Sequence, residues 1–138
     1  MTECFCQALR QAARHITEVY DRALEPTGLR TTQFSLLRTL RKGPLAITAL
    51  ADAQALDRTT LNRTLAPLVR GGLISIVAGP DDRRRRDVTL TPHGRARIAA
   101  AEHRWAHAQM ELARSLGRKK SAQLRSLLET LSQNELPV

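Results

Sequence analysis

One short stretch of the sequence gathers side chains that hydrogen-bond to nucleic-acid bases. They are Arg58, Thr59, Thr60, Asn62 and Arg63. Asp57 precedes them and is a favourable N-cap, so we expect a helix from there to Arg70 with these residues on its first turns. Arginine binds the O6/N7 edge of guanine, asparagine binds adenine, and the threonine methyl contacts thymine. Because the recognition helices of DNA-binding proteins contact base edges with their N-terminal residues, the stretch favours recognition of a DNA duplex. The alternative is the solvated polar face of any amphipathic helix.

A second stretch consists of four consecutive basic residues between two aspartates. They are Arg83, Arg84, Arg85 and Arg86, flanked by Asp82 and Asp87. Along an extended strand the first and third would point to one side and the second and fourth to the other. One pair would then enter a minor groove while the other contacts phosphates, and the aspartates would orient the guanidiniums by paired hydrogen bonds. A solvated loop is the alternative.

The basic charge lies in the middle of the chain. The 138 residues include 22 Lys and Arg, 19 of them Arg, against 13 Asp and Glu, for a net charge of +9. Residues 30–97 hold 13 of the basic and five of the acidic residues, a net charge of +8. Such a segment is typical of a surface for a polyanion, with nucleic acid ahead of a membrane surface. A basic surface that is merely solvated is the other interpretation.

The composition favours one mainly helical domain. Hydrophobic residues make up 42% and aromatic residues only 3%, so Leu and Ala must build the core. No run of 18 apolar residues is present to span a membrane. The first six residues, Met1 to Cys6, lack the basic and apolar regions of a secretory signal. We therefore expect a cytoplasmic protein.

Hydrophobic spacing and capping residues predict the elements that position the two stretches. Helices are expected over Cys6–Leu24, from a cap at Thr31 or Thr32 to Lys42, over Ile47–Ala53, from Asp57 to Arg70, from Pro92 to a break at Gly117, and around Leu124–Leu131. Leu73–Val77 and Asp87–Leu90 are expected to form a two-stranded hairpin with the arginines at its tip. Three short helices followed by a hairpin make a winged helix-turn-helix.

Apolar stripes predict which helix faces are buried. The buried stripe of the recognition helix consists of Leu61, Leu65, Leu68 and Val69. In the first helix, the apolar residues at helical spacing are Leu9, Ala12, Ala13, Ile16, Val19, Tyr20 and Ala23. Ile98, Ala101, Trp105, Ala108 and Leu112 form a narrow 3-4-3-4 seam of the kind that packs against another helix. We therefore expect one domain, 1–138, with a winged-helix module at about 30–92. Dimerisation helices at 4–25 and 92–133 would pack against a second copy.

The chain resembles the MarR family of winged-helix transcriptional regulators over roughly residues 8–132. The matching segments are Gly28-Leu29, Gln33-Phe34, Gly43-Pro44-Leu45, Asp57–Arg63, Gly72-Leu73-Ile74, Asp82-Arg83-Arg84, Val88–Thr91 and Gly94-Arg95. The resemblance implies a homodimer, most often a repressor, on a pseudo-palindromic operator. It also implies that Arg84 enters the minor groove, braced by Asp82. Two residues depart from the family's pattern. Ala55 stands in the helix-turn-helix turn where members often carry glycine, which predicts an altered turn. Pro67 falls late in the recognition helix.

Three kinds of signal are open from the sequence. Similar regulators release DNA when a small phenolic or anionic ligand enters a pocket beside the dimerisation helices. The candidates to line it are Arg14, His15, Phe34 and Trp105, each of which is otherwise a core or surface residue. Cys4 and Cys6 suggest thiol or redox sensing, with inert cysteines as the alternative. Glu102, His103 and His107 have a spacing that suits zinc, with a solvated histidine pair as the alternative.

Two other functional classes compete with a regulator. An enzyme is disfavoured because the sequence has no glycine-rich phosphate loop, no nucleophile elbow and no His-Glu-x-x-His motif. A non-specific architectural DNA-binding protein would use the basic surface without reading bases. It would bind random duplex nearly as well as a palindrome. We expect no required cofactor.

Overall fold

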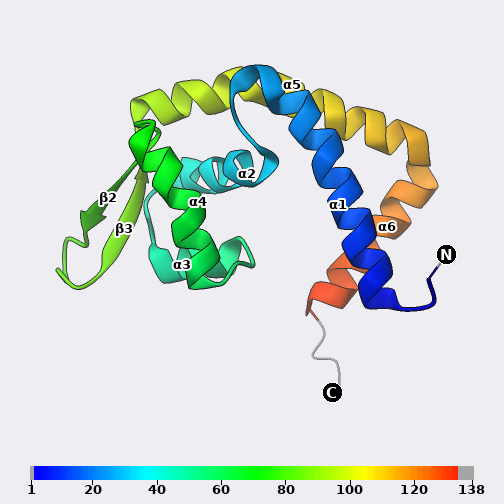
Figure 1. The fold of residues 1–138 in the computed structure, drawn as a ribbon, viewed down its shortest axis with the longest axis horizontal. Coiled ribbons are helices and arrows are strands. Elements are labelled where there is room, and N and C mark those ends of the chain that lie inside the picture. The colour runs from blue at the N-terminus through cyan, green and yellow to red at the C-terminus, as the bar shows by residue number, and fades with distance from the viewer. Residues whose placement is uncertain (1, 134–138) are drawn as a thin grey trace. The chain divides into compact units, whose positions relative to one another are not determined.

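A computed structural model describes residues 2–133 and confirms the predicted mainly α, winged-helix fold (Figure 1). The helices are α1 (Phe5–Leu24), α2 (Thr31–Thr39), α3 (Ile47–Ala53), α4 (Arg58–Arg70), α5 (Pro92–Leu116) and α6 (Arg118–Gln133). The strands are β1 (Leu45–Ala46), β2 (Ile74–Ala78) and β3 (Arg86–Leu90), and 3-10 turns η1 (Glu25–Thr27) and η2 (Leu40–Lys42) follow α1 and α2. Within the described range, none of the helices has the length and apolarity to cross a membrane.

The chain divides into two compact units, and the boundary falls within α5. The first unit ends at Trp105 and the second begins at Ala106. The first contains α1 to α4, the sheet and a core of leucines with Phe34, Ile74, Val88 and Ile98. The second contains the end of α5 and all of α6, separated by Gly117, whose φ of +84° suits glycine.

The core of the first unit takes only part of each predicted stripe. In α1, Tyr20 and Leu24 are buried, whereas Leu9 is 43% exposed and Ala12 is also exposed. The core of the single chain therefore does not bury the N-terminal half of the α1 stripe, and the expectation that this half packs against a second copy stays a prediction. In α5, Ile98 and Ala101 pack into the chain's own core, so the predicted seam is only partly available to another subunit.

The sheet has three antiparallel strands in the order β1-β3-β2. Ile76 of β2 pairs with Val88 of β3, and Val88 also pairs with Leu45 of β1. The predicted two-stranded hairpin is present, but the sequence missed β1, because two residues are too few for an alternating pattern. In Figure 1 the β2–β3 hairpin extends away from α3 and α4.

The start of α2 differs from the prediction of a threonine cap. Arg30 is the N-cap residue, and its N–H donates to Oε1 of Gln33 at 3.0 Å. The N–H of Thr31 donates to Oδ1 of Asp21 at 2.7 Å. Side chains from α2 itself and from α1 thus satisfy the first N–H groups, so no threonine cap is needed.

The end of α4 follows the predicted Gly71-Gly72 stop. Gly72 adopts a φ of +71°, and the N–H of Leu73 bonds back to the carbonyl of Leu68 at 3.0 Å. The helix continues past Pro67 to Arg70. Val69 was expected in the buried stripe but is 42% exposed, because the core contacts the side of α4 that carries Leu68.

The junction between the hairpin and α5 is tightly packed. The hydroxyl of Thr91 donates to the carbonyl of Gly72 at 2.6 Å and accepts from the N–H of Gly94 at 3.0 Å, which confirms the predicted Thr91-Pro92 helix start. A Cβ on Gly94 would overlap the carbonyl oxygen of Leu73 and crowd the side chain of Leu90. This approach fixes the first turn of α5 against the start of β2.

Replacement of Gly94 by alanine is expected to destabilise the protein by about 1–3 kcal/mol, because the added methyl group forces α5 away from Leu73. Urea denaturation followed by circular dichroism measures this change. Helix propensity alone predicts the opposite sign, since alanine favours helix over glycine. A Gly94→Ala variant as stable as wild type would show that the contact is not tight.

Candidate nucleic-acid interface

The first turns of α4 present one polar face to solvent. All five residues that the sequence predicts to contact DNA bases are exposed: Arg58, Thr59, Thr60, Asn62 and Arg63. On the opposite face, Leu61, Leu65 and Leu68 are at most 2% exposed. The burial of these leucines therefore determines which side of α4 faces outward.

Asp57 caps α4 as predicted. Its Oδ1 accepts a hydrogen bond from the backbone N–H of Thr60 at 3.2 Å, and its φ and ψ of −72° and 162° are extended. Hydrogen bonds from the Thr60 side chain and backbone lower the pKa of Asp57 below its ordinary value. The carboxylate is thus ionised at neutral pH and complements the positive end of the helix dipole.

The turn between α3 and α4 does not support the expectation of an altered shape at Ala55. This residue adopts a φ of +52°, the left-handed conformation that glycine takes freely, at a cost on the order of 1–2 kcal/mol for alanine. The N–H of Leu56 donates to the carbonyl of Ala51 at 3.0 Å, and Leu56 packs against the core. The two helices are thereby joined through a packed turn.

The tip of the hairpin is a closed turn and not an extended strand. Arg83 and Arg84 lie in the turn, which is closed by hydrogen bonds from Gly79 N–H to Arg85 O at 2.8 Å and from Arg85 N–H to Asp82 O at 3.1 Å. The predicted alternation of the four arginines is therefore wrong. Oδ1 of Asp82 accepts from the backbone N–H of Arg84 at 2.9 Å, so this aspartate orders the backbone beneath that arginine.

The four arginines at the tip are not equivalent. Nε of Arg85 donates to Oδ1 of Asp87 at 2.7 Å, and the Asp87 side chain is only 8% exposed. This hydrogen bond raises the pKa of Arg85 above its ordinary value. Asp87 orients one guanidinium, as the sequence predicted. Arg85 therefore stabilises the wing, which is the hairpin of β2 and β3 with the turn between them. Arg83, Arg84 and Arg86 are exposed and form no ion pair with residues 2–133.

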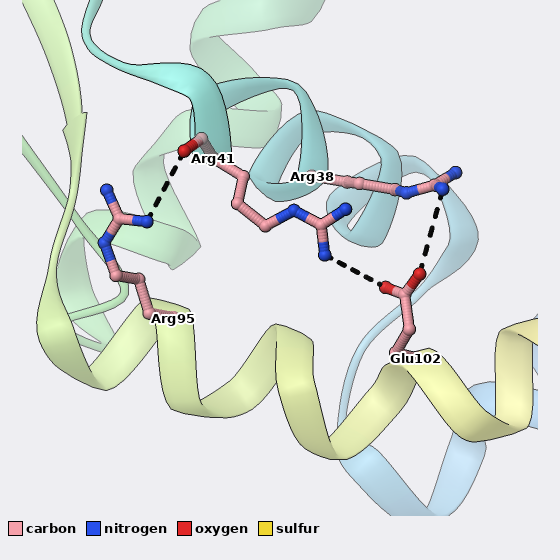
Figure 2. Close-up of polar contacts among 4 residues, drawn as sticks. All are labelled: Arg38, Arg41, Arg95 and Glu102. Carbon is pink, nitrogen blue, oxygen red and sulfur yellow. Dashed lines mark hydrogen bonds and ion pairs between the residues drawn. The ribbon is translucent and has the colours of Figure 1, made fainter.

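A cluster that the sequence did not predict joins α2 and η2 to α5 (Figure 2). Glu102 forms an ion pair with Arg38 at 3.7 Å and accepts a hydrogen bond from Arg41 at 3.5 Å. Arg95 donates to the backbone carbonyl of Arg41 at 3.4 Å. The guanidinium of Arg38 also lies 4.1 Å from the ring centroid of Trp105. About 60 residues separate these partners in sequence, so no local spacing signals the cluster.

The predicted effector residues do not gather in one place. Phe34 and Trp105 line a hollow of about 320 Å³, together with Ile16, Thr17, Tyr20, Thr31, Ser35 and Arg38. Arg14 instead pairs with Glu18 at 3.3 Å on the exposed side of α1, and His15 is exposed. Arg14 and His15 therefore do not line this hollow, and their role in a ligand pocket stays a prediction. Arg38 is a cation of the hollow that the sequence analysis did not name.

The predicted thiol and metal residues are all at the surface or otherwise engaged. Cys4 and Cys6 are exposed free thiols beside the start of α1. Glu102 contacts two arginines, and His103 and His107 are exposed. In the part of the chain that the structure describes, no three His, Cys, Asp or Glu side chains form a group that could hold a metal ion.

Comparison with solved structures identifies the class. The Mycobacterium tuberculosis transcriptional regulator MosR, in complex with DNA, is 37% identical, with 94% of this chain and 98% of that chain covered and a TM-score of 0.78. The repressor CouR, bound to a 23-mer DNA duplex, is 30% identical over 95% and 94% of the two chains, with a TM-score of 0.86. Bordetella bronchiseptica BpsR, whose DNA binding is regulated by 6-hydroxynicotinic acid, is 25% identical over 96% of each chain, with a TM-score of 0.87.

The fold and these relatives define a winged-helix transcriptional regulator. The model of the MarR family matches residues 27–85, which include α2 to α4 and the hairpin tip. The chain belongs to the MarR family, as its resemblance predicted. The relatives are transcriptional regulators and not enzymes. A comparison with curated protein sequences gives no significant match.

Arg85→Ala is expected to lower the melting temperature by a few degrees, because it leaves the nearly buried carboxylate of Asp87 without its hydrogen-bond donor. The matched control is Arg84→Ala, which removes the same charge from an exposed side chain and should leave the melting temperature unchanged. Differential scanning calorimetry compares the two. Equal melting temperatures would show that the Arg85–Asp87 pair does not hold the wing.

Proposed function

We propose that two copies of this chain bind a pseudo-palindromic DNA operator and repress transcription. The observation that carries the proposal is the exposed polar face at the start of α4, in the same module as a hairpin tip with three arginines that form no ion pair with residues 2–133. The DNA complexes of MosR and CouR support it. Arg58, Asn62 and Arg63 have donors that match purine edges in a major groove.

The wing is proposed to contact DNA through arginines that are not used by the fold. Arg84 enters the minor groove, where narrow A·T-rich segments attract guanidinium groups. Arg83 and Arg86 contact phosphates, and Asp82 holds the backbone of the turn in place. Arg85 acts as a positioning residue through its bond to Asp87.

Dimerisation is proposed because two helices, each taken by itself, present large apolar side chains to solvent. In α1, Phe5 is 87% and Leu9 43% exposed. In α6, Leu124, Leu127, Leu128 and Leu131 are 41–63% exposed and recur at helical spacing. Apolar stripes of this kind mark protein–protein contacts. A second copy of the chain would cover them and place two recognition helices on one DNA duplex.

A signal is proposed to control DNA binding through the hollow lined by Phe34, Trp105 and Arg38. The hollow presents aromatic rings and one cation, which fits a small aromatic acid. The regulation of BpsR by 6-hydroxynicotinic acid supports this ligand class. Two other signals stay predictions: thiol sensing by Cys4 and Cys6, and zinc sensing at Glu102, His103 and His107. The contacts described above support neither of them.

The central test is the fluorescence anisotropy of DNA from upstream of the protein's own gene and of a scrambled duplex, titrated over salt. Arg63→Ala should reduce the preference for the upstream DNA by at least about fivefold, because it loses a base contact. Arg84→Ala should weaken both complexes by similar factors and flatten the salt dependence.

Arg104→Ala is the matched control, since it removes one exposed arginine of α5 that forms no ion pair with residues 2–133. It should leave the preference for upstream DNA unchanged. Equal binding of wild type to both duplexes would favour the architectural alternative. Wild-type behaviour of both Arg63→Ala and Arg84→Ala would refute the roles of α4 and the wing.

The dimer is tested by Leu127→Glu, which places a charge in the apolar stripe of α6. Size-exclusion chromatography with light scattering should give twice the mass of one chain for wild type and the mass of one chain for the variant at micromolar concentration. Ser126→Glu is the control, because Ser126 lies on the other side of the same helix. A wild-type monomer would contradict the proposal.

A further inference from the structure

The recognition helix α4 is held to the core by contacts that have little directionality. Its anchoring side chains are the buried leucines Leu61, Leu65 and Leu68. Apolar burial stabilises a contact in proportion to the area removed from water and not to its angle, so it tolerates small rotations of a helix. Hydrogen bonds to base edges do not, because they weaken steeply when donor and acceptor are misaligned. Base readout by α4 therefore requires a directional contact with the rest of the module.

One hydrogen bond of this kind joins the turn before α4 to α2. Nε2 of Gln54 donates to Oγ1 of Thr39 at 2.8 Å, and both side chains are partly buried. Two other side-chain hydrogen bonds of this region are local: Asp57 accepts from the N–H of Thr60, and Thr64 donates to the carbonyl of Thr60. The Gln54–Thr39 bond instead connects two elements across 15 residues of sequence.

The direction of this bond is fixed by a third residue. The hydroxyl of Thr39 has one proton and donates it to the carbonyl of Ser35 at 2.9 Å. Its oxygen then accepts from Gln54, so the amide must present its NH2 group to Thr39. The two bonds form a chain from the turn to the backbone of α2. Movement of the turn would leave a partly buried polar group unpaired, which is unfavourable.

Gln54 also lies next to the strained position of the turn. It is the C-cap of α3, and Ala55 after it adopts a φ of +52°. Backbone conformations of this kind persist only where the surrounding structure holds them. On the other side of Ala55, Leu56 packs against the core, and its N–H bonds to the carbonyl of Ala51 at 3.0 Å. The strained residue is therefore held by apolar packing on one side and by the Gln54 side chain on the other.

We propose that the Gln54–Thr39 hydrogen bond fixes the orientation of α4 relative to α2, which makes both members positioning residues for base readout. Neither belongs to the face from Arg58 to Arg63 that is proposed to contact bases, so they act through the turn and not on DNA. Non-specific binding depends on positive charge near phosphates, so a small change in orientation affects it little. The pair therefore controls discrimination between sequences. This inference rests on the proposed DNA-binding function and adds residues that determine its specificity.

The first test compares the affinities for the upstream and the scrambled duplex by fluorescence anisotropy. Gln54→Leu removes the amide donor, and Thr39→Val replaces the hydroxyl by a methyl group of similar size. Each should reduce the preference for upstream DNA about three- to tenfold and change binding of the scrambled duplex by less than about twofold. Thr39→Ser keeps the hydroxyl and should restore the preference. A loss of folded protein would lower both affinities by the same factor, so the ratio does not report it.

Thr32→Val is the matched control, because Thr32 is an exposed threonine of the same helix whose side chain forms no hydrogen bond with residues 2–133. It should keep the wild-type preference. The double variant of Gln54→Leu and Thr39→Val should lose no more than either single variant, since both remove one contact. Additive losses, a wild-type preference in either single variant, no rescue by Thr39→Ser, or an equal loss in Thr32→Val would overturn the inference.

Hydrogen exchange of the protein without DNA separates this inference from the proposed function. The amide of Leu56, which bonds to Ala51 across the turn, should exchange about three- to tenfold faster in Gln54→Leu and Thr39→Val, because the turn opens more easily. Unchanged exchange would refute the role of the pair, whatever the DNA results. If exchange follows this order but wild type has no preference for upstream DNA, the regulator function is refuted and the positioning of the turn is supported.

Discussion

The interface depends on the burial of one face of α4. Leu61, Leu65 and Leu68 are almost completely removed from water, and burial of each side chain stabilises the fold by roughly 1.5–3 kcal/mol. Because an α-helix repeats every 3.6 residues, burial of this face also fixes the direction in which the opposite face of the helix points. The polar side chains from Arg58 to Arg63 are therefore presented by packing and not by contacts of their own. Asp57 sets where this presentation begins, since its carboxylate stabilises the first turn.

The wing holds four adjacent positive charges at the end of a short hairpin. Asp87 is the one buried charged residue in the described part of the chain, and it pairs with Arg85. A carboxylate with so little solvent contact requires a donor, so this arginine is committed to the fold. The backbone bonds of the turn and the side chain of Asp82 then keep the remaining arginines in solvent. One charge of the cluster thus stabilises the platform from which the other three project.

The contacts of α5 connect the winged-helix module to the hollow that is proposed to bind a ligand. Gly94 permits close approach to the start of β2, and Glu102 holds α2 and η2 through two arginines. Arg38 takes part in this contact and in the wall of the hollow. Its guanidinium is held by an ion pair with Glu102 and a cation–π contact with Trp105.

The sequence alone determined the helices, the hairpin, the caps at Asp57 and Thr91, the leucine face of α4 and the family. These features follow from spacing and capping within about ten residues, where helical and strand periodicities are reliable. Tertiary structure decided the rest. The strand β1 exists only because Leu45 reaches Val88, and the capping of α2 uses Asp21 from another helix. The pairing of Arg38 with Glu102 joins residues more than sixty positions apart. Such contacts depend on how elements pack in space, and no local pattern in a single sequence records that packing.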